Sequence, residues 1–350
     1  MADIRWIDFR SIGIEGQAWQ DMPHESVYDR FPAEFKSRLP ESVWVNSHSS
    51  TGMCISFITD SPVIYIRRDF AEAQLEEHNF NNCSFSGFDL YAEDRPGKFR
   101  WVATTSHRHG NDSEYPLTLD PVRGRHRYRL YLPCRNQLLK AELGIAPDSM
   151  FEAVAPRPET EALVYYGSSI VHGAYSSHAG LCHPAWLARK LNIPSYNFGF
   201  SGSAHMELEL AEIFASLNPA VYVIDAMPNM GLDLIRANAK PFLKRLRELR
   251  PHTPGLLMED APKTNGWFFR EKLEDNRRRW NAMRKVYREL REEGVRHMAY
   301  LKGNTLFGTD NEATIDGIHP NAKGHKIIAE RICGYLKNAE SRNVADGKSE

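Results

Sequence analysis

The 350-residue sequence has few cysteines and no pattern that would pair them. Its five cysteines, at positions 54, 83, 134, 182 and 333, are odd in number, widely spaced, and include no Cys-x-x-Cys pair. Disulfide-stabilised secreted domains and structural zinc sites usually have even-numbered or closely paired cysteines. We therefore expect reduced thiols rather than a disulfide framework.

The sequence also lacks a long apolar run and an excess of charge of either sign. It has 44 Lys and Arg against 45 Asp and Glu, which gives a formal net charge of −1 at pH 7. Balanced charge provides no general attraction to nucleic acid or to an anionic membrane, and a membrane span needs about 20 apolar residues. We expect neither kind of partner.

The amino terminus has neither the basic region nor the apolar region of a secretory signal peptide. The chain as given is therefore expected to stay in the cytoplasm, although a secreted chain already trimmed of its signal would look the same. No internal repeat is visible, and 350 residues are enough for two domains.

Residues 1–152 have the pattern of a β-domain. Short apolar or alternating runs separated by turn-forming residues predict strands at 43–45, 53–58, 63–66, 85–91, 101–103 and 127–132. Such regularly spaced short strands favour a β-sandwich. The exposed edges of a sandwich can be covered by self-association, so a homo-oligomer is compatible with the sequence.

A different pattern follows the Pro-Arg-Pro-Glu segment at 156–159, which we interpret as a linker between domains. Apolar strands at 163–166, 195–198, 220–224, 255–258 and 296–301 alternate with helical patterns at 184–191, 207–217, 232–249, 272–292 and 321–336. This alternation predicts an α/β/α domain with a parallel sheet over residues 160–337. The polar residues 338–350 are expected to form a disordered tail.

Polar residues suited to acyl transfer lie in two short segments. Ser169 belongs to a Gly-Ser-Ser sequence after the first strand of the second domain, and Asp316 stands three residues before His319 in Asp-Gly-Ile-His-Pro. A serine hydroxyl needs an imidazole to accept its proton, and the imidazole needs a carboxylate to hold its tautomer. Because proline disfavours helical backbone at the residue before it, one loop should present both Asp316 and His319.

Two further segments contain candidates for an oxyanion hole. Gly202 follows the second strand of the α/β domain, and Asn229 follows the third. A backbone N–H and a side-chain amide are both suitable donors to a developing oxyanion. Because parallel strands end at a common edge of the sheet, Ser169, Gly202 and Asn229 should lie at that edge.

In this order, the four segments resemble the four sequence blocks of the SGNH (GDSL-type) hydrolase superfamily. The resemblance implies that Ser169 is the nucleophile, that His319 is the base and that Asp316 orients it. It also implies an oxyanion hole formed by the N–H groups of Ser169 and Gly202 and by the Asn229 side chain. Neither a metal nor an organic cofactor is expected.

Two positions depart from the general pattern of the superfamily. Ser168 replaces the aspartate of Gly-Asp-Ser, and Met227 replaces a glycine two residues before Asn229. Both departures are similar to a subgroup with Tyr-Gly-Thr/Ser-Ser-Ile and Leu/Met-Pro-Asn-Met blocks, whose N-terminal domain contains Gly-x-Asp-Leu-Tyr. Here Gly-Phe-Asp-Leu-Tyr at 87–91 matches, so the resemblance extends over about residues 5–336 and implies a jelly-roll-like N-terminal domain.

Ser201 is the main rival for the role of nucleophile. Its surroundings, Gly-Phe-Ser-Gly-Ser at 199–203, nearly match the Gly-x-Ser-x-Gly elbow. The last glycine is missing, however, and no acid with suitable spacing follows before His319. Asp89 and Tyr91 of the Gly-x-Asp-Leu-Tyr sequence could reach the catalytic cleft, but we favour a role in docking the two domains.

Four more residues could contact substrate: His172, Asp225, Glu259 and Trp267. For each the sequence leaves an alternative open. His172, together with His178 and His183, could line the pocket as ordinary polar residues rather than form a zinc site, which would need convergent ligands. Asp225 could cap a turn. Glu259 could lie on the surface, and Trp267 could pack at the start of a helix.

Taken together, these residues predict a serine esterase. In this superfamily a β-sandwich attached to the hydrolase domain often accompanies carbohydrate esters, so the expected substrate is a short-chain ester, above all an acetyl ester, of a carbohydrate or small polar molecule. The alternatives are a thioesterase, a lysophospholipase-type acyl hydrolase, and a catalytically silent glycan-binding protein.

Overall fold

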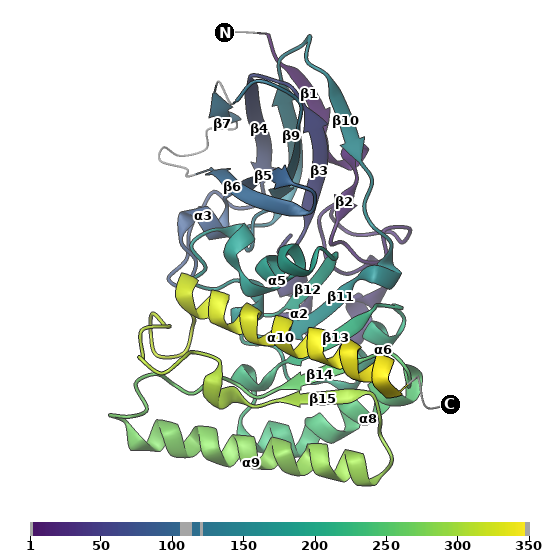
Figure 1. Cartoon of the computed structure of the whole chain (residues 1–350), viewed down its shortest axis with the longest axis vertical. Helices are drawn as coiled ribbons and strands as arrows, with labels where there is room; N and C mark the ends of the chain where they lie inside the picture. Colours follow the sequence, from purple (N-terminus) through teal and green to yellow (C-terminus); the bar gives the residue numbers. More distant parts are fainter. Residues whose placement is uncertain (1–2, 106–113, 120–121, 347–350) are drawn as a thin grey trace.

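The computed structural model describes residues 3–105, 114–119 and 122–346. A β-rich part lies above an α/β part along the long axis of the molecule (Figure 1). All five cysteines are free thiols, as predicted. Within the described ranges, no helix combines the length and the apolar character needed to cross a bilayer.

Two antiparallel sheets form the N-terminal domain. One contains β1 (Arg5–Asp8), β9 (Leu138–Ile145), β4 (Val63–Phe70) and β7 (Glu114–Leu119), in that order. The other contains β10 (Phe151–Val154), β3 (Cys54–Thr59), β8 (His126–Tyr131), β5 (Asp89–Arg95) and β6 (Lys98–Thr104), with β2 (Ile14–Glu15) paired to β3. Apolar residues of both sheets, including Phe57, Ile66 and Leu143, form one buried core. The predicted β-sandwich is confirmed.

A short helix replaces one of the predicted strands, and another predicted strand begins later than expected. Residues 43–45 lie in α2 (Glu41–Ser47), and α3 (Asn82–Phe85) precedes β5, which begins only at Asp89. In α2, Val43 and Trp44 are buried while Val45 is 56% exposed. Val43 and Trp44 pack into the core of the α/β domain rather than into the sandwich. A three-residue apolar run cannot reveal this helical placement, because it is too short to show a period.

Five parallel strands form the sheet of the second domain. Their order is β12 (Ser195–Gly199), β11 (Leu163–Gly167), β13 (Val221–Asp225), β14 (Gly255–Met258) and β15 (Met298–Leu301). The helices α5 (His183–Leu191) and α10 (Ala322–Asp346) pack on one face, where α10 crosses the front of the sheet in Figure 1. The helices α6 (Leu208–Ala215), α8 (Lys240–Leu249) and α9 (Arg270–Glu292) pack on the other. This confirms the three-layer α/β/α prediction.

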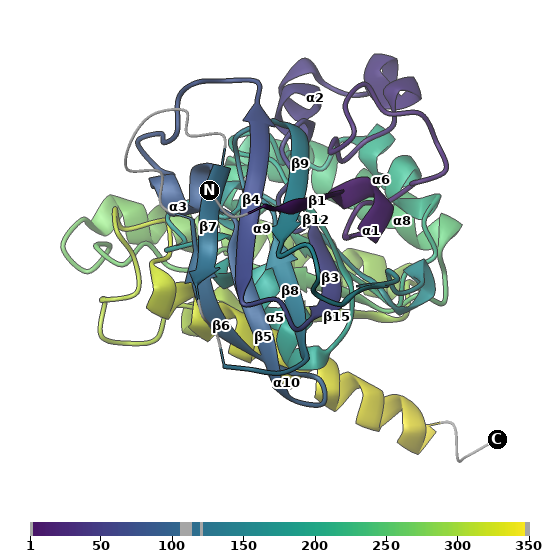
Figure 2. The same cartoon turned by 90° about the horizontal axis from the view of Figure 1, so that it is seen from above.

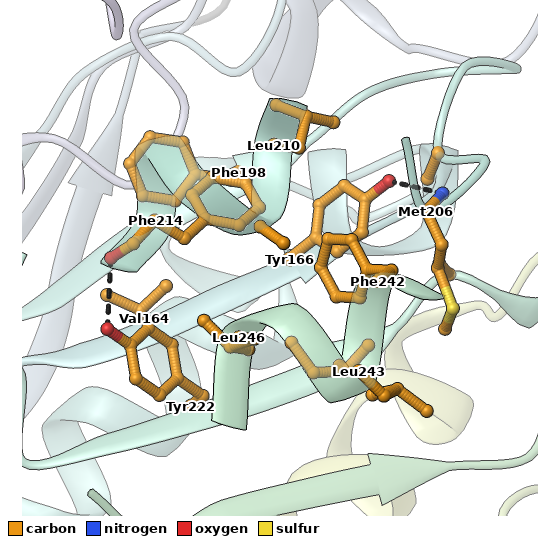
Figure 3. Packing of buried hydrophobic residues seen from close by; sticks show 14 of the residues in the cluster. Val164, Tyr166, Phe198, Met206, Leu210, Phe214, Tyr222, Phe242, Leu243 and Leu246 are labelled. Carbon is orange, nitrogen blue, oxygen red and sulfur yellow. Dashed lines mark hydrogen bonds between the residues drawn. The ribbon is translucent and has the colours of Figure 1, made fainter. Parts of the chain in front are cut away.

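An aromatic core fills the layer between the sheet and the helices α6 and α8 (Figure 3). Alternate strand residues, such as Val164, Tyr166 and Tyr222, point into this layer. The buried tyrosine hydroxyls have hydrogen-bond partners, as burial requires. Tyr166 Oη accepts from the N–H of Met206 at 3.0 Å, and Tyr222 Oη donates to the carbonyl of Phe214 at 2.9 Å.

Helix α10 continues to Asp346, whereas the sequence analysis predicts a disordered tail from residue 338. Residues 338–346 contain helix-forming Ala, Glu and Arg and no proline or glycine, and Gly347 is the next residue that would favour termination. Viewed from above, this helix extends away from the rest of the molecule (Figure 2). The prediction is therefore wrong for residues 338–346, and residues 347–350 lie outside the described ranges.

Candidate active site

Ser169 begins the short helix α4 (Ser169–His172), directly after β11. The turn between them requires glycine at position 167, since a Cβ there would lie 2.4 Å from the Val171 side chain and 2.5 Å from the carbonyl of Asp225. Ser168 caps the helix, its Oγ accepting from the N–H of Ile170 at 3.3 Å. A serine at this position, in place of the family's aspartate, therefore still satisfies the first turn.

Ser169, His319 and Asp316 form a continuous hydrogen-bonded chain. Ser169 Oγ lies 2.8 Å from His319 Nε2, and His319 Nδ1 lies 2.7 Å from Asp316 Oδ2. Both distances lie in the normal hydrogen-bonding range. The structure thus brings together three residues from segments about 150 positions apart, with the imidazole between the hydroxyl and the carboxylate.

The loop before α10 presents Asp316 and His319 together, as the sequence predicts. Asp316 Oδ1 accepts from the backbone N–H groups of Ile318 (2.9 Å) and His319 (2.8 Å). Partial burial alone would raise the pKa of Asp316, but the hydrogen bonds from the His319 backbone and imidazole and from Ile318 lower it below its usual value. The carboxylate is therefore ionised throughout the neutral pH range.

Gly202 lies in the turn after β12, with a φ of +70°, and no atom lies within 4 Å of where its Cβ would be. Asn229 ends the 3₁₀ turn Met227–Asn229 after β13. Its Oδ1 accepts from the N–H of Ala204 at 3.3 Å, which fixes the orientation of the amide. Among the described residues, none accepts a hydrogen bond from Asn229 Nδ2.

A cavity of about 240 Å³ lies beside these groups. Asn229 and the apolar side chains of Ile170, Met230 and Ile318 form part of its lining. The volume is below the roughly 300–1,000 Å³ of pockets for drug-sized ligands. Ser169 is not one of the lining residues, but its neighbour Ile170 is, so the cavity suits a small group close to the serine.

Charged residues on the cavity wall neutralise one another. Arg279 donates to Asp260 Oδ2 at 2.5 Å and to Asp275 Oδ2 at 3.0 Å, and Asp275 also pairs with Lys263 at 3.1 Å. Arg279 further donates to the carbonyl of Met227 at 3.1 Å. This network therefore holds the turn that ends in Asn229.

Trp267 is 72% exposed and lies in the loop after β14, followed by Phe268, which is 68% exposed. This loop is bonded to the loop that contains Asp316 and His319, since the N–H of Thr264 donates to the carbonyl of Gly317 at 2.9 Å and the Thr264 and Thr314 hydroxyls lie 2.6 Å apart. The Trp267 indole is therefore exposed on a segment that is bonded to the loop of Asp316 and His319.

Glu259 is neither a surface residue nor available to substrate. Its side chain is fully buried, pairs with Arg284 at 2.6 and 3.0 Å, and accepts from Tyr300 Oη and the N–H of Gly303, both at 2.8 Å. Asp260 is buried as well. The suggested substrate contact of Glu259 is wrong, because all of these partners come from later elements that enclose the carboxylate.

Asp225 is also buried, and its carboxylate lies 3.4 Å from Tyr165 Oη and 3.9 Å from His183 Nε2. Burial, reinforced by the nearby Asp260, raises its pKa well above the usual value. The Asp225 side chain is therefore enclosed among buried residues. This contradicts both roles suggested by the sequence, namely contact with substrate and capping of a turn.

His172 lies behind the site rather than on the pocket wall. It is fully buried, with Nε2 2.8 Å from Ser49 Oγ and Nδ1 3.0 Å from Ser201 Oγ. This contradicts the expected contact with substrate. It also argues against Ser201, the rival nucleophile, because its Oγ is bonded to a buried histidine that no carboxylate of the described ranges orients.

The other two histidines that closely follow Ser169 in the sequence, His178 and His183, do not converge with His172 on a common point. His178 Nδ1 bonds to Asp89, while His183 lies 3.1 Å from the Nδ1 of His325 and 2.9 Å from Tyr165 Oη. No group of three or more His, Cys, Asp or Glu side chains among the described residues could hold a metal ion.

Asp89 of the Gly-x-Asp-Leu-Tyr sequence lies at the domain interface. Its carboxylate accepts from Trp101 Nε1 at 2.9 Å, from the N–H of Gly180 at 2.8 Å, and from His178. The ring of Tyr91 lies 4.0 Å from the guanidinium of Arg189. Both side chains therefore bind the segment between α4 and α5 and the helix α5, in agreement with a docking role.

Sequence reasoning missed Tyr175, whose ring centroid lies 5.5 Å from that of His319. Tyr175 has a left-handed φ of +56°, and its N–H donates to the carbonyl of Asn79 in the N-terminal domain at 2.8 Å. A tyrosine in a loop gives no signal of these contacts, because His319 is distant in the sequence and Asn79 belongs to the other domain.

Comparisons with known proteins agree with this geometry. Residues 160–337 match the GDSL-like Lipase/Acylhydrolase family, and residues 4–151 match the family described as the N-terminus of Esterase_SGNH_hydro-type. No curated protein matches the chain in sequence.

Solved structures share the two-domain arrangement. A protein from Bacteroides ovatus ATCC 8483 described as a GDSL-like lipase is 28% identical, with a TM-score of 0.87 over 94% of this chain and 96% of that one. The salicylyl-acyltransferase SsfX3 from a tetracycline biosynthetic pathway is 19% identical (TM-score 0.69; 94% and 95% covered). A family two carbohydrate esterase from Cellvibrio japonicus is 13% identical (TM-score 0.61; 97% and 98% covered). The last two are similar in fold alone.

Proposed function

Because this chain belongs to the GDSL-like lipase/acylhydrolase family, we propose that it is an esterase in which Ser169 is the nucleophile. The observation that supports this most is the hydrogen-bonded chain from Ser169 Oγ through His319 to Asp316. An imidazole between a hydroxyl and a carboxylate can accept the serine proton as the hydroxyl attacks.

In the proposed reaction, Ser169 Oγ forms a bond to the ester carbonyl carbon while its proton moves to His319 Nε2. The resulting imidazolium is stabilised by the ionised Asp316, which already accepts from Nδ1. The carbonyl oxygen becomes an oxyanion, for which the N–H groups of Ser169 and Gly202 and the amide of Asn229 are the proposed donors.

Collapse of the tetrahedral intermediate breaks the bond to the alcohol, which leaves with the proton from His319. Water then attacks the acyl-serine and loses its proton to His319. As the bond from the acyl carbon to Ser169 Oγ breaks, His319 returns this proton to Oγ and the acid is released. These steps need only groups that this chain supplies, and the Asn229 amide is already oriented by Ala204 before substrate binds.

We propose a short acyl group, above all acetyl, as the part that is cleaved, and a carbohydrate or small polar alcohol as the part that is released. The cavity of about 240 Å³ supports a small acyl group. The exposed Trp267 beside the catalytic loop offers a flat surface for the apolar face of a sugar ring.

One observation favours a second candidate, an acyl hydrolase for longer or more apolar substrates. Ile315 and Ile318 of the catalytic loop are exposed, as are Trp267, Phe268 and Phe269 of the loop bonded to it. Such a surface could also bind an acyl chain. The chain-length preference of the enzyme separates the two candidates.

The test is hydrolysis of p-nitrophenyl esters from acetate to decanoate by wild type, Ser169→Ala and Ser195→Ala. Ser195 is a matched control, because it is a buried serine at the start of β12 whose Oγ has no partner among the described residues. Triad serines elsewhere contribute about 10⁴- to 10⁶-fold in turnover. We expect loss only in Ser169→Ala, with acetate as the best substrate.

Preference for long chains would replace the short-acyl proposal with the second candidate. Equal activity of Ser169→Ala and wild type would remove the proposed nucleophile, and labelling of Ser201 by a covalent serine probe would identify its rival. The wild-type protein could also hydrolyse none of these esters and yet, when immobilised on a column, retain acetylated oligosaccharides. That result would identify a glycan-binding protein.

A further inference from the structure

The loop that contains Gly202 is held by residues of the N-terminal domain. Arg30 lies in a part of the N-terminal segment that packs on the α/β domain, and its Nη1 donates to the carbonyls of Asn197 at 3.0 Å and Gly199 at 2.7 Å. Its Nη2 donates to the carbonyl of Asn46 in α2. Arg30 therefore joins the last residues of β12, immediately before the Gly202 turn, to α2, a helix of the N-terminal segment whose buried residues pack into the core of the α/β domain.

Arg30 is unusual because it is only 2% exposed, and within the described ranges no carboxylate forms an ion pair with it. Complete burial and, to a lesser degree, Arg135 lower its pKa to about 9, so that the guanidinium is still charged at neutral pH. Its cation lies 4.7 Å from the ring centroid of Phe200, the first residue of the turn. Carbonyl dipoles and an aromatic face thus stabilise a buried charge.

A second connection reaches the same turn from the N-terminal domain. Ser49 Oγ bonds to His172, whose other ring nitrogen bonds to Ser201 Oγ, one residue before Gly202. In addition, Asn46 Nδ2 donates to the carbonyl of Ser201 at 3.4 Å. Arg30 therefore holds the strand residues just before the turn, Asn46 holds the turn at the carbonyl of Ser201, and Ser49 holds the Ser201 side chain through His172.

The turn is also bonded to the strand that leads to the nucleophile. The N–H of Phe200 donates to the carbonyl of Gly167 at 2.8 Å, and the N–H of Ser203 closes the turn on the carbonyl of Phe200 at 3.0 Å. An oxyanion donor must lie about 2.7–3.1 Å from the charge it stabilises. Small displacements of this turn therefore change the stabilisation of the oxyanion.

We propose that Arg30 and Ser49 of the N-terminal domain are positioning residues for the Gly202 oxyanion donor, so that this domain completes the catalytic apparatus. This proposal rests on the proposed function, since it assumes that Gly202 binds an oxyanion. Neither residue contacts substrate, and their effect on the reaction passes through the backbone of the turn.

The test compares Arg30→Gln with Arg247→Gln. Arg247 is also a buried arginine, and it donates to the carbonyls of Thr253 and Pro251 between α8 and β14, at the sheet edge opposite Ser169. Both variants lose bonds to carbonyls, so both should lower the thermal midpoint. Only Arg30→Gln should affect the turn that carries Gly202.

For Arg30→Gln we expect kcat for p-nitrophenyl acetate to fall about 10- to 100-fold, with KM changed less than about threefold. Affinity for a boronic acid that forms a tetrahedral adduct on the serine should fall by a similar factor. At temperatures below its thermal midpoint, Arg247→Gln should keep the wild-type kcat and the wild-type affinity for the boronic acid. If Arg30→Gln loses stability but keeps both quantities, Arg30 has a structural role only and the proposal is wrong.

Ser49→Ala is a second variant that tests the proposal if Arg30→Gln does not fold. It removes only a hydroxyl group. We expect a fall of about three- to tenfold in kcat and boronate affinity, because only one of the two connections is lost. Wild-type values for Ser49→Ala would overturn the proposal for that residue. Failure of the proposed function is a separate result, since Ser169→Ala would then be as active as wild type.

Discussion

Asn229 permits a substitution that separates oxyanion binding from folding. In the structure, Asn229 Oδ1 accepts from the N–H of Ala204, and Nδ2 is the proposed donor to the oxyanion. Asn229→Asp keeps an oxygen for Ala204 and replaces the donor by a second oxygen. Asn229→Ala removes both groups.

Loss of one oxyanion donor should lower kcat about 10²- to 10³-fold, which corresponds to about 2.7–4 kcal/mol of transition-state stabilisation. We expect at least this loss in both variants, and a greater one in Asn229→Asp, because a carboxylate repels the oxyanion. KM should change little, since the charge that Asn229 stabilises does not exist in the bound ester.

Stability should follow the opposite order. Asn229→Ala leaves the N–H of Ala204 without its acceptor and should cost about 1 kcal/mol, whereas Asn229→Asp retains that bond. The measurement is kcat and KM for p-nitrophenyl acetate together with the thermal midpoint. Activity of Asn229→Asp within about threefold of wild type would falsify the assignment of Asn229 to the oxyanion hole.

Three further predictions concern the cavity and the buried carboxylates. Gly231 lines the cavity, has a φ of −66°, and has no atom within 4 Å of the position of a Cβ. Gly231→Val should therefore fold, narrow the cavity, and lower the ratio of kcat/KM for butyrate to that for acetate about tenfold. An unchanged ratio would place the acyl group elsewhere. Glu259→Gln should cost about 2 kcal/mol in a denaturant titration, because it breaks the pair with a partly exposed Arg284; a neutral effect would contradict this. Burial raises the pKa of Asp225 in the folded state. Above about pH 4 this carboxyl therefore ionises readily only in the unfolded state, so the wild-type protein loses stability as the pH rises. Asp225→Asn should therefore match wild type near pH 3 and exceed it at pH 7, and a less stable variant at pH 7 would show that the ionised form is needed.

The sequence is most informative where the relevant interactions are local. Asp316 and His319 are three residues apart, so one loop presents both whatever the remainder of the chain does. Ser169 and Asn229 could be placed at one edge because strand direction alone determines which residues follow a parallel strand. The roles of these residues are still predictions, although Ser169, His319 and Asp316 are joined by hydrogen bonds in the structure.

Prediction fails where burial is decided by distant partners. Glu259 follows a strand as Asn229 does, but Arg284 and Tyr300 enclose it. His172 is near Ser169 in the sequence, yet its side chain is buried and bonded to Ser49 of the N-terminal segment. Arg30 belongs to no motif, and its significance is visible only when its carbonyl acceptors are known.

The Asp89 carboxylate has a consequence for how such proteins can be recombined. It is fully buried, and its acceptor capacity is satisfied by Trp101 from its own domain and by Gly180 and His178 from the other. A foreign hydrolase domain without matching donors would leave this charge desolvated and unpaired, at a cost of several kcal/mol. Exchange of modules between relatives should therefore succeed only when the segment at 178–180 is transferred together with the sandwich that recognises it.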